Sequence, residues 1–172
     1  TTKMLEAAGL RARAAGNIGP NAVLELLKAE DAGELPDAWV LELSSFQLAT
    51  TSSLHCDAAA LLNVTEDHLD WHGSMAAYAE AKRRIFSADT VRVLNRDDKL
   101  SAASADGVDP RRVRTFGQGA PSHPGESGLM HVDGLVWLGY VPSLPETEPT
   151  SAAARRLAGE EVPEAQDRKS VV

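Results

Sequence analysis

Residues Trp39–Lys82 read WVLELSSFQLATTSSLHCDAAALLNVTEDHLDWHGSMAAYAEAK, and this stretch decides the fold of the chain. Two short apolar runs, Ala38–Leu41 and Ala58–Leu62, each end abruptly at polar residues. Such runs are typical of strands that are buried on both faces of a parallel sheet. In these sheets ligands bind just beyond the carboxyl ends of the strands. The sequence therefore predicts that Glu42 and the pair Asp67 and His68 meet at one crevice.

A helix is predicted over Ser74–Phe86, with Ser74 as its N-cap residue. Lys82 falls on the buried stripe of this helix, whereas Arg83 and Arg84 are expected to point to solvent. Lys82 has two interpretations. Its stem covers apolar surface while the ammonium reaches water, or burial leaves part of the amine neutral and able to do chemistry. The stripe consists of Met75, Tyr78, Ala79, Lys82, Ile85 and Phe86.

The composition is that of a globular chain with one domain, or one domain and a tail. Hydrophobic residues make up 43% of the 172 positions, and no apolar run approaches the roughly 20 residues of a membrane helix. The opening residues lack the apolar core of a signal peptide. The single cysteine, Cys56, is interpreted as a small core residue in a reducing, cytoplasmic compartment. The net charge of -8 argues against nucleic acid or an anionic membrane as partner, and we expect a monomer.

Short strands alternate with helices in the first hundred residues. This order predicts an α/β fold with a doubly wound, mostly parallel sheet flanked by helices. The loop Gly16–Gly19 follows the first strand, and its glycines permit close approach of the backbone to a ligand. The predicted strands cover residues 10–15, 38–41, 58–62 and 91–94, and the predicted helices cover 21–28 and 74–86.

The pattern changes from residue 113 onward. Three short strands are predicted at 113–116, 129–132 and 135–138, and Asp133-Gly134 between the last two is a strong hairpin signal. We expect these strands to form a short antiparallel extension at the edge of the main sheet. Residues 140–172 are polar and rich in proline, which predicts an irregular tail that is either disordered or an artefact of the gene sequence.

Glu42, Asp67, His68 and Asp70 are the side chains with metal-binding chemistry. Sites rich in carboxylate oxygens favour Mg²⁺ or Mn²⁺. Glu42 could instead pair with an arginine, and His68 could be an ordinary hydrogen-bonded histidine. The grouping of these acids with His68 favours the metal site. No Walker A pattern G-x-x-x-x-G-K-[ST] occurs in the chain, so these residues do not cradle a triphosphate in that way.

Five strings resemble the Mur ligases, in order and with similar spacing over residues 1–138. Within this family the likeness is greatest to the branch that adds D-glutamate, because its sister ligases carry other residues after the glutamate of LELSSFQL. The fold that the resemblance implies is the P-loop-type central domain of these ligases. The strings are GNIG (16–19), LELSSFQL (41–48), TTSS (50–53), LLNVTEDHLDWHG (61–73) and YAEAKRRIF (78–86).

The resemblance implies an ATP-dependent amide synthesis. The carboxylate of UDP-N-acetylmuramoyl-L-alanine is phosphorylated to an acyl phosphate, which the amine of D-glutamate then attacks. Glu42 matches the family's magnesium-binding glutamate, and His68 matches the histidine that holds a second magnesium. Lys82 matches the lysine that is carbamylated and supports the second metal. The resemblance thus makes His68 and Lys82 the catalytic candidates.

Three further residues, Asn17, Ser44 and Gln47, match positions that line the muramoyl substrate pocket. The family's uridine-binding domain, phosphate-binding glycine loop and glutamate-binding domain have no counterpart in this sequence. We therefore expect residues 1–139 to be a central ATPase-type domain without its P-loop, and the isolated chain to be inactive. Two other functions stay open: a non-catalytic module that binds UDP-sugar precursors, and a metal-dependent hydrolase that uses Glu42 and His68.

Overall fold

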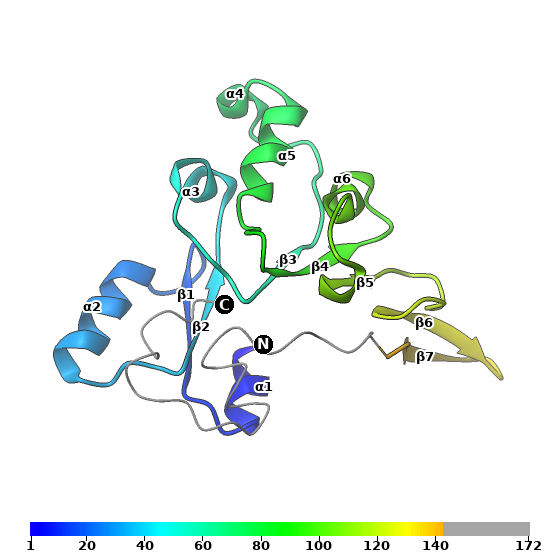
Figure 1. Ribbon diagram of the computed structural model, residues 1–172, viewed down its shortest axis with the longest axis horizontal. Coiled ribbons are helices and arrows are strands. Elements are labelled where there is room, and N and C mark those ends of the chain that lie inside the picture. The colour runs from blue at the N-terminus through cyan, green and yellow to red at the C-terminus, as the bar shows by residue number, and fades with distance from the viewer. Residues whose placement is uncertain (143–172) are drawn as a thin grey trace. The chain divides into compact units, whose positions relative to one another are not determined.

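The computed structural model describes residues 1–142, which form two compact units, 1–57 and 58–142 (Figure 1). Both units contain parallel strands joined through helices, so the predicted fold class is confirmed. None of the helices within these residues is long and apolar enough to cross a membrane. The predicted tail falls, from residue 143 onward, outside the described part of the chain.

The first unit is built on two parallel strands. These strands, β1 (Ala12–Gly16) and β2 (Ala38–Glu42), run in register until Gly16 lies opposite Glu42. Between them runs α2 (Ala22–Ala32), and α1 (Thr2–Ala7) and α3 (Ser45–Thr50) complete the unit. A parallel pair needs such a crossover connection, because the chain must return to the same end of the sheet.

The limits of α2 follow from its two end residues. Asn21 is the N-cap, since its side chain accepts hydrogen bonds from the N–H groups of Val23 and Leu24 at 3.0 and 3.2 Å. Gly33 ends the helix in the left-handed conformation that glycine adopts most readily. The helix is longer than predicted. Glu30 and Asp31 are exposed residues of its last turn, and in the sequence such a pair of acidic residues resembles a polar connection.

The second unit contains a five-stranded sheet in the order β3-β4-β5-β6-β7. Its strands are β3 (Ala58–Leu61), β4 (Val91–Asn95), β5 (Val113–Phe116), β6 (Glu126–Val132) and β7 (Leu135–Tyr140). Its helical segments are α4 (Leu69–His72), α5 (Met75–Arg83), α6 (Lys99–Ala102), η1 (Ala103–Ala105) and η2 (Pro110–Arg112).

The antiparallel part of this sheet is smaller than predicted. Strands β3, β4, β5 and β6 are parallel to one another, and only β7 runs antiparallel, against β6. The short helical segments between β4 and β5 return the chain to the end of the sheet at which β4 begins. Strand β5 therefore runs parallel to β4. The predicted hairpin is confirmed, since Asp133 and Gly134 both have positive φ, at 51° and 77°. Figure 1 shows β6 and β7 as a ribbon that extends from the sheet.

The core of the second unit lies between the sheet and α5. Leu94 of β4 is fully buried, and Tyr78 and Ala79 of α5 pack in the same cluster with Leu61 and Val64. The predicted stripe is therefore confirmed at its centre. The first unit has smaller clusters, formed by Ala15, Ala29 and Trp39 and by Leu10 and Ala38.

The end of α5 differs from the prediction. The helix stops at Arg83, three residues before Phe86, and Ser74 caps its start by accepting a hydrogen bond from the N–H of Ala77 at 3.2 Å. The expectation that Arg83 points to solvent is wrong. Its guanidinium donates to the Ser104 hydroxyl and to the Leu100 carbonyl, both at 3.3 Å. Arg83 thereby satisfies a carbonyl near the end of α6, which a helix cannot satisfy internally.

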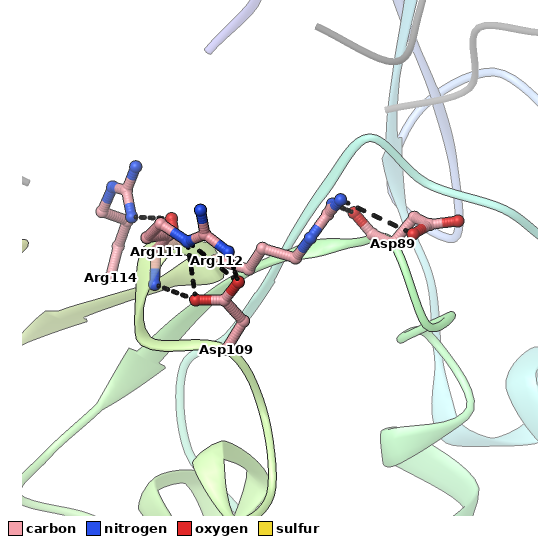
Figure 2. A network of polar contacts seen from close by, with 5 residues as sticks. All are labelled: Asp89, Asp109, Arg111, Arg112 and Arg114. Carbon is pink, nitrogen blue, oxygen red and sulfur yellow. Dashed lines mark hydrogen bonds and ion pairs between the residues drawn. The ribbon is translucent and has the colours of Figure 1, made fainter. Parts of the chain in front are cut away.

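A polar network lies at the start of β5 (Figure 2). The Arg111 side chain donates to both carboxylate oxygens of Asp109, and its backbone N–H donates to Oδ1 at 2.9 Å. Arg112 binds the Asp89 carbonyl and lies 3.6 Å from the Asp89 carboxylate. The hydrogen bonds to Asp109 lower its pKa from 3.8 to about 2, and those from the Arg111 side chain have the largest effect.

The Asp109 carboxyl is expected to titrate in the folded chain with a midpoint near 2. In Arg111→Ala the midpoint should rise toward 3.8 without reaching it, because the backbone N–H of residue 111 still donates to Asp109. Because the folded pKa lies below the unfolded one, this group stabilises the fold above pH 3.8, and the contribution is lost as the pH falls toward 2. The carboxyl carbon shift in an NMR titration measures the midpoint. Arg114→Ala is the control, since Arg114 donates to the carbonyls of Arg111 and Val113 instead. Equal midpoints in wild type and Arg111→Ala would contradict the assignment.

Cys56 is buried, with 6% of its surface exposed, as the sequence predicted for a core residue. Burial, followed by the charge of Asp57, raises the pKa of its thiol to about 11. We expect iodoacetamide to modify Cys56 at pH 8 roughly 100-fold more slowly in the folded chain than in urea, because the thiolate is the reactive form. Mass spectrometry of timed samples measures both rates, and similar rates would show that the thiol is accessible and ionised in the fold.

Candidate ligand and metal site

In the first unit, Asn17 and Glu42 lie at the carboxyl ends of β1 and β2. The backbone N–H of Asn17 donates to the Glu42 carbonyl at 2.7 Å, and the N–H of Gly16 donates to the Pro20 carbonyl at 3.0 Å. A side chain at position 16 would collide with the Glu42 carbonyl, and Gly16 has a φ of 129°. Glycine is therefore required here, and the close backbone contact places the GNIG loop beside Glu42.

Ser44 and Gln47 form a capping box at the start of α3. The Ser44 hydroxyl accepts the Gln47 N–H at 3.3 Å, while the Gln47 side-chain oxygen accepts the Ser44 N–H at 2.8 Å. This spacing of serine and glutamine satisfies two N–H groups that the helix leaves unpaired. Both residues thus have a structural role directly after Glu42, and their predicted role in substrate binding stays a prediction.

In the second unit, His68 is held by its neighbour Asp67. One Asp67 oxygen accepts the backbone N–H of His68 at 2.8 Å, and the other lies 3.3 Å from the ring Nε2. His68 adopts a left-handed φ of 52° as the N-cap of α4, a conformation that is uncommon for a residue with a side chain. The ring remains 44% exposed, so a ligand can reach it.

His68 and Lys82 both lie near the ring of Tyr78. The His68 and Tyr78 ring centroids are 6.5 Å apart with an edge-on geometry, and the Lys82 Nζ lies 5.2 Å from the Tyr78 centroid. The ring of His72 also approaches the Tyr78 ring, with 5.1 Å between the two centroids. Tyr78 is itself buried with 6% exposure. Its fixed ring therefore places the imidazole and the amine on one side of α5.

Within residues 1–142, no group of three or more His, Cys, Asp and Glu side chains is placed to hold a metal ion. The donors available are the Asp67 and His68 pair in the second unit and the Glu42 carboxylate in the first. Each of these small groups, taken by itself, fits Mg²⁺, because Mg²⁺ keeps several waters and commonly takes only one or two protein carboxylates plus substrate phosphates. It does not fit a cation that needs a complete cage of protein ligands.

The structure therefore brings the predicted residues together in two groups. Asn17 adjoins Glu42 in the first unit, and His68 and Lys82 share the ring of Tyr78 in the second. That Glu42 and His68 lie close together stays a prediction, since the two residues belong to different units. The helical periodicity predicted only that Tyr78 belongs to the core. Its spacing of four residues from Lys82 is the signal that places the two on one helix face.

Parallel strands joined through helices, with polar residues at the strand ends, make this chain an α/β domain of the class that binds ligands at the carboxyl ends of its strands. The profile of the Mur ligase middle domain matches residues 2–129, so the chain belongs to this family. Among curated relatives, a UDP-N-acetylmuramoylalanine–D-glutamate ligase of Bordetella avium is 54% identical over 138 residues, which are 80% of this chain and 27% of that protein. The ligase of the same name from Ralstonia nicotianae is 49% identical over 164 residues, 94% of this chain and 32% of that protein.

The ligase of Bordetella pertussis with this name is 48% identical over 156 residues, which cover 91% of this chain and 31% of that protein. The chain thus spans about a third of the length of the curated relatives it matches.

Proposed function

We propose that this chain is the middle domain, residues 1–139, of an ATP-dependent ligase. The ligase would join D-glutamate to UDP-N-acetylmuramoylalanine in the synthesis of peptidoglycan, the cell-wall polymer, in the cytoplasm. The observation that carries the proposal is the 54% identity over 138 residues to a relative with this name. The positions of Asn17 and Glu42 at adjacent strand ends support it, because ligands of parallel sheets bind there.

The proposed reaction has two steps. A carboxylate oxygen of the muramoyl substrate attacks the γ-phosphorus of ATP, and the bond to the bridging oxygen breaks to release ADP. The amine of D-glutamate then attacks the acyl carbon, the bond from carbon to the phosphate oxygen breaks, and phosphate leaves as the amine loses a proton to solvent. Both steps concentrate negative charge on oxygens, so they require fixed orientation and nearby positive charge.

Glu42, His68 and a carbamylated Lys82 are the residues that we propose hold two Mg²⁺ ions. These cations, when bound, would neutralise charge on the phosphate and carboxylate oxygens. The exposed Glu42 carboxylate at the end of β2 suits one of them. His68 and Lys82 suit the other, because both side chains adjoin Tyr78. The face of the Tyr78 ring attracts an ammonium and not an anion, so a carbamate on Lys82 would not be bound by the ring and would be available as a metal ligand.

Asn17, Ser44 and Gln47 are proposed to bind the muramoyl substrate. The backbone of Asn17 is fixed by its hydrogen bond to the Glu42 carbonyl, and the side chain is exposed. Gln47 uses its side-chain oxygen in the capping box, which leaves the Nε2 amide as the group that can donate to a substrate oxygen. The capping box therefore orients a donor as well as starting a helix.

A hybrid enzyme tests the proposal. In it, the aligned part of this chain replaces the 138 matching residues of the Bordetella avium relative. We expect the hybrid to release phosphate from ATP only when both the muramoyl nucleotide and D-glutamate are present. In Glu42→Gln, a variant of the same size without the charge, this release should fall roughly 100-fold, because the change removes a proposed metal ligand.

Two results would point elsewhere. An inactive hybrid whose 172-residue chain still binds the muramoyl nucleotide would indicate a binding module. Hydrolysis of ATP by the isolated chain, without D-glutamate, would indicate a metal-dependent hydrolase.

A further inference from the structure

The segment 95–101 runs from the last residue of β4 into α6 and contacts the chain on both sides of that strand. Since β4 lies between β3 and β5 in the sheet, its carboxyl end adjoins the segment that leads to His68 and the segment that leads to β6. On the β5 side, the Asp97 carboxylate accepts the N–H of Gln118 at 2.6 Å, and Arg96 donates to the Ser127 carbonyl at 2.6 Å. The contacts on the β3 side come from two other residues of the same segment.

Asp98 and Ser101 make the contacts on the β3 side. One oxygen of Asp98 accepts the N–H of Val64 at 3.1 Å, and the other accepts the N–H of Ser101 at 2.7 Å as the N-cap of α6. The Ser101 hydroxyl donates to the Leu61 carbonyl at 2.6 Å and accepts the N–H of Asn95 at 2.9 Å. Ser101 is completely buried.

These bonds fix the chain where it leaves β3. Leu61 is the last residue of that strand, and Val64 lies four residues before His68. Val64 is itself buried, with 5% exposure, so its N–H would lose a hydrogen bond without gaining full access to water if Asp98 were absent. A charged acceptor such as Asp98 makes this bond stronger than a neutral one.

We infer that Asp98 and Ser101 are positioning residues that hold the segment 61–64 and thereby set the place of His68 beside Tyr78. This inference rests on the proposed metal role of His68. It adds two residues that bind neither substrate nor metal. They act by reducing the freedom of the segment that carries the imidazole, and metal affinity depends on such supporting hydrogen bonds.

The variant Asp98→Ser separates this role from the capping of α6. Serine is as good an N-cap as aspartate, but its side chain is too short to reach Val64 as well. Asp97→Ser is the matched control. It removes a carboxylate from the neighbouring position, where the partner is Gln118 on the β5 side. Asp98→Asn replaces Asp98→Ser if the latter does not fold. The two N–H groups bind different oxygens of Asp98, and asparagine replaces one of these oxygens with an NH2 group, which donates and cannot accept.

The experiment uses the 172-residue chain and Mn²⁺ alone. In wild type, Mn²⁺ is expected to broaden the ring resonances of His68. In Asp98→Ser, exchange of the Val64 amide should be roughly tenfold faster, and the Mn²⁺ concentration needed to broaden His68 should rise roughly tenfold. Asp97→Ser should match wild type in both. Faster Val64 exchange with unchanged Mn²⁺ binding at His68 would overturn the inference.

A second readout needs no metal. The Tyr78 ring shifts the proton resonances of a ring held 6.5 Å away, so the His68 shifts report its position. Asp98→Ser is expected to move them toward the values of the unfolded chain. If Mn²⁺ fails to broaden His68 in wild type, the proposed metal role fails, and these shifts alone decide the inference. Unchanged shifts in Asp98→Ser would then refute it.

Discussion

Replacing Lys82 with alanine in the hybrid enzyme is expected to lower the rate of ligation roughly 100-fold or more. Lys82 lies in the last turn of α5, half-buried, with its Nζ 5.2 Å from the Tyr78 ring centroid. In the proposed function its carbamate supplies an anionic metal ligand, which alanine cannot replace. Steady-state release of phosphate in the presence of both substrates measures the loss.

Short carboxylic acids such as acetate or formate should restore part of this activity. A free carboxylate carries the charge and oxygens of the missing carbamate, and the alanine leaves space for it. Arg84→Ala is the matched control. It removes a basic, exposed side chain two residues away, and we expect it to keep the wild-type rate and to show no response to the acids. Full activity in Lys82→Ala would show that the lysine only covers apolar surface with its stem.

Gly16→Ala is expected to destabilise the first unit by about 3 kcal/mol. Two effects combine at this position. The backbone φ of 129° suits glycine, and an added Cβ would collide with the Glu42 carbonyl. The strand pairing that places Gly16 opposite Glu42 must therefore shift, and the hydrogen bond from Asn17 to Glu42 should weaken with it.

Urea denaturation of the 172-residue chain, followed by tryptophan fluorescence, measures this loss. Trp39 is buried in the first unit with 8% exposure, whereas Trp71 and Trp137 are each 55% exposed, so the signal reports mainly the first unit. Gly19→Ala provides the comparison. Gly19 also has a positive φ, 97°, but no atom lies within 4 Å of a Cβ added there. Equal losses in the two variants would show that the collision with Glu42 has no effect.

Local sequence signals predicted the elements of the fold well. The cap at Ser74, the start of α2 next to Asn21, the hairpin at Asp133-Gly134 and strand β5 lie where expected, because each depends on neighbouring residues only. The helices α3, α4 and α6 were missed. Each has at most six residues, too few for the apolar periodicity that identifies a helix.

For the candidate site, too, the sequence indicated some features and missed others. The sequence and its resemblance named Glu42, His68 and Lys82, but they did not indicate what holds these residues in place. The partner of Asp98 lies 34 positions away, at Val64, and the partners of Arg83 lie 17 and 21 positions away. Contacts between residues so far apart depend on how the strands are ordered in the sheet, and no local pattern encodes that order.

By itself, the sequence determined the class of fold and the family, and it proposed the side chains that carry chemistry, since all three follow from residue types and short spacings. Only the tertiary structure decided that Gly16 must lack a side chain, that His68 and Lys82 both lie near the Tyr78 ring, and that Asp98 anchors the segment before His68. The physical reason is that close packing and buried hydrogen bonds join residues that the sequence separates.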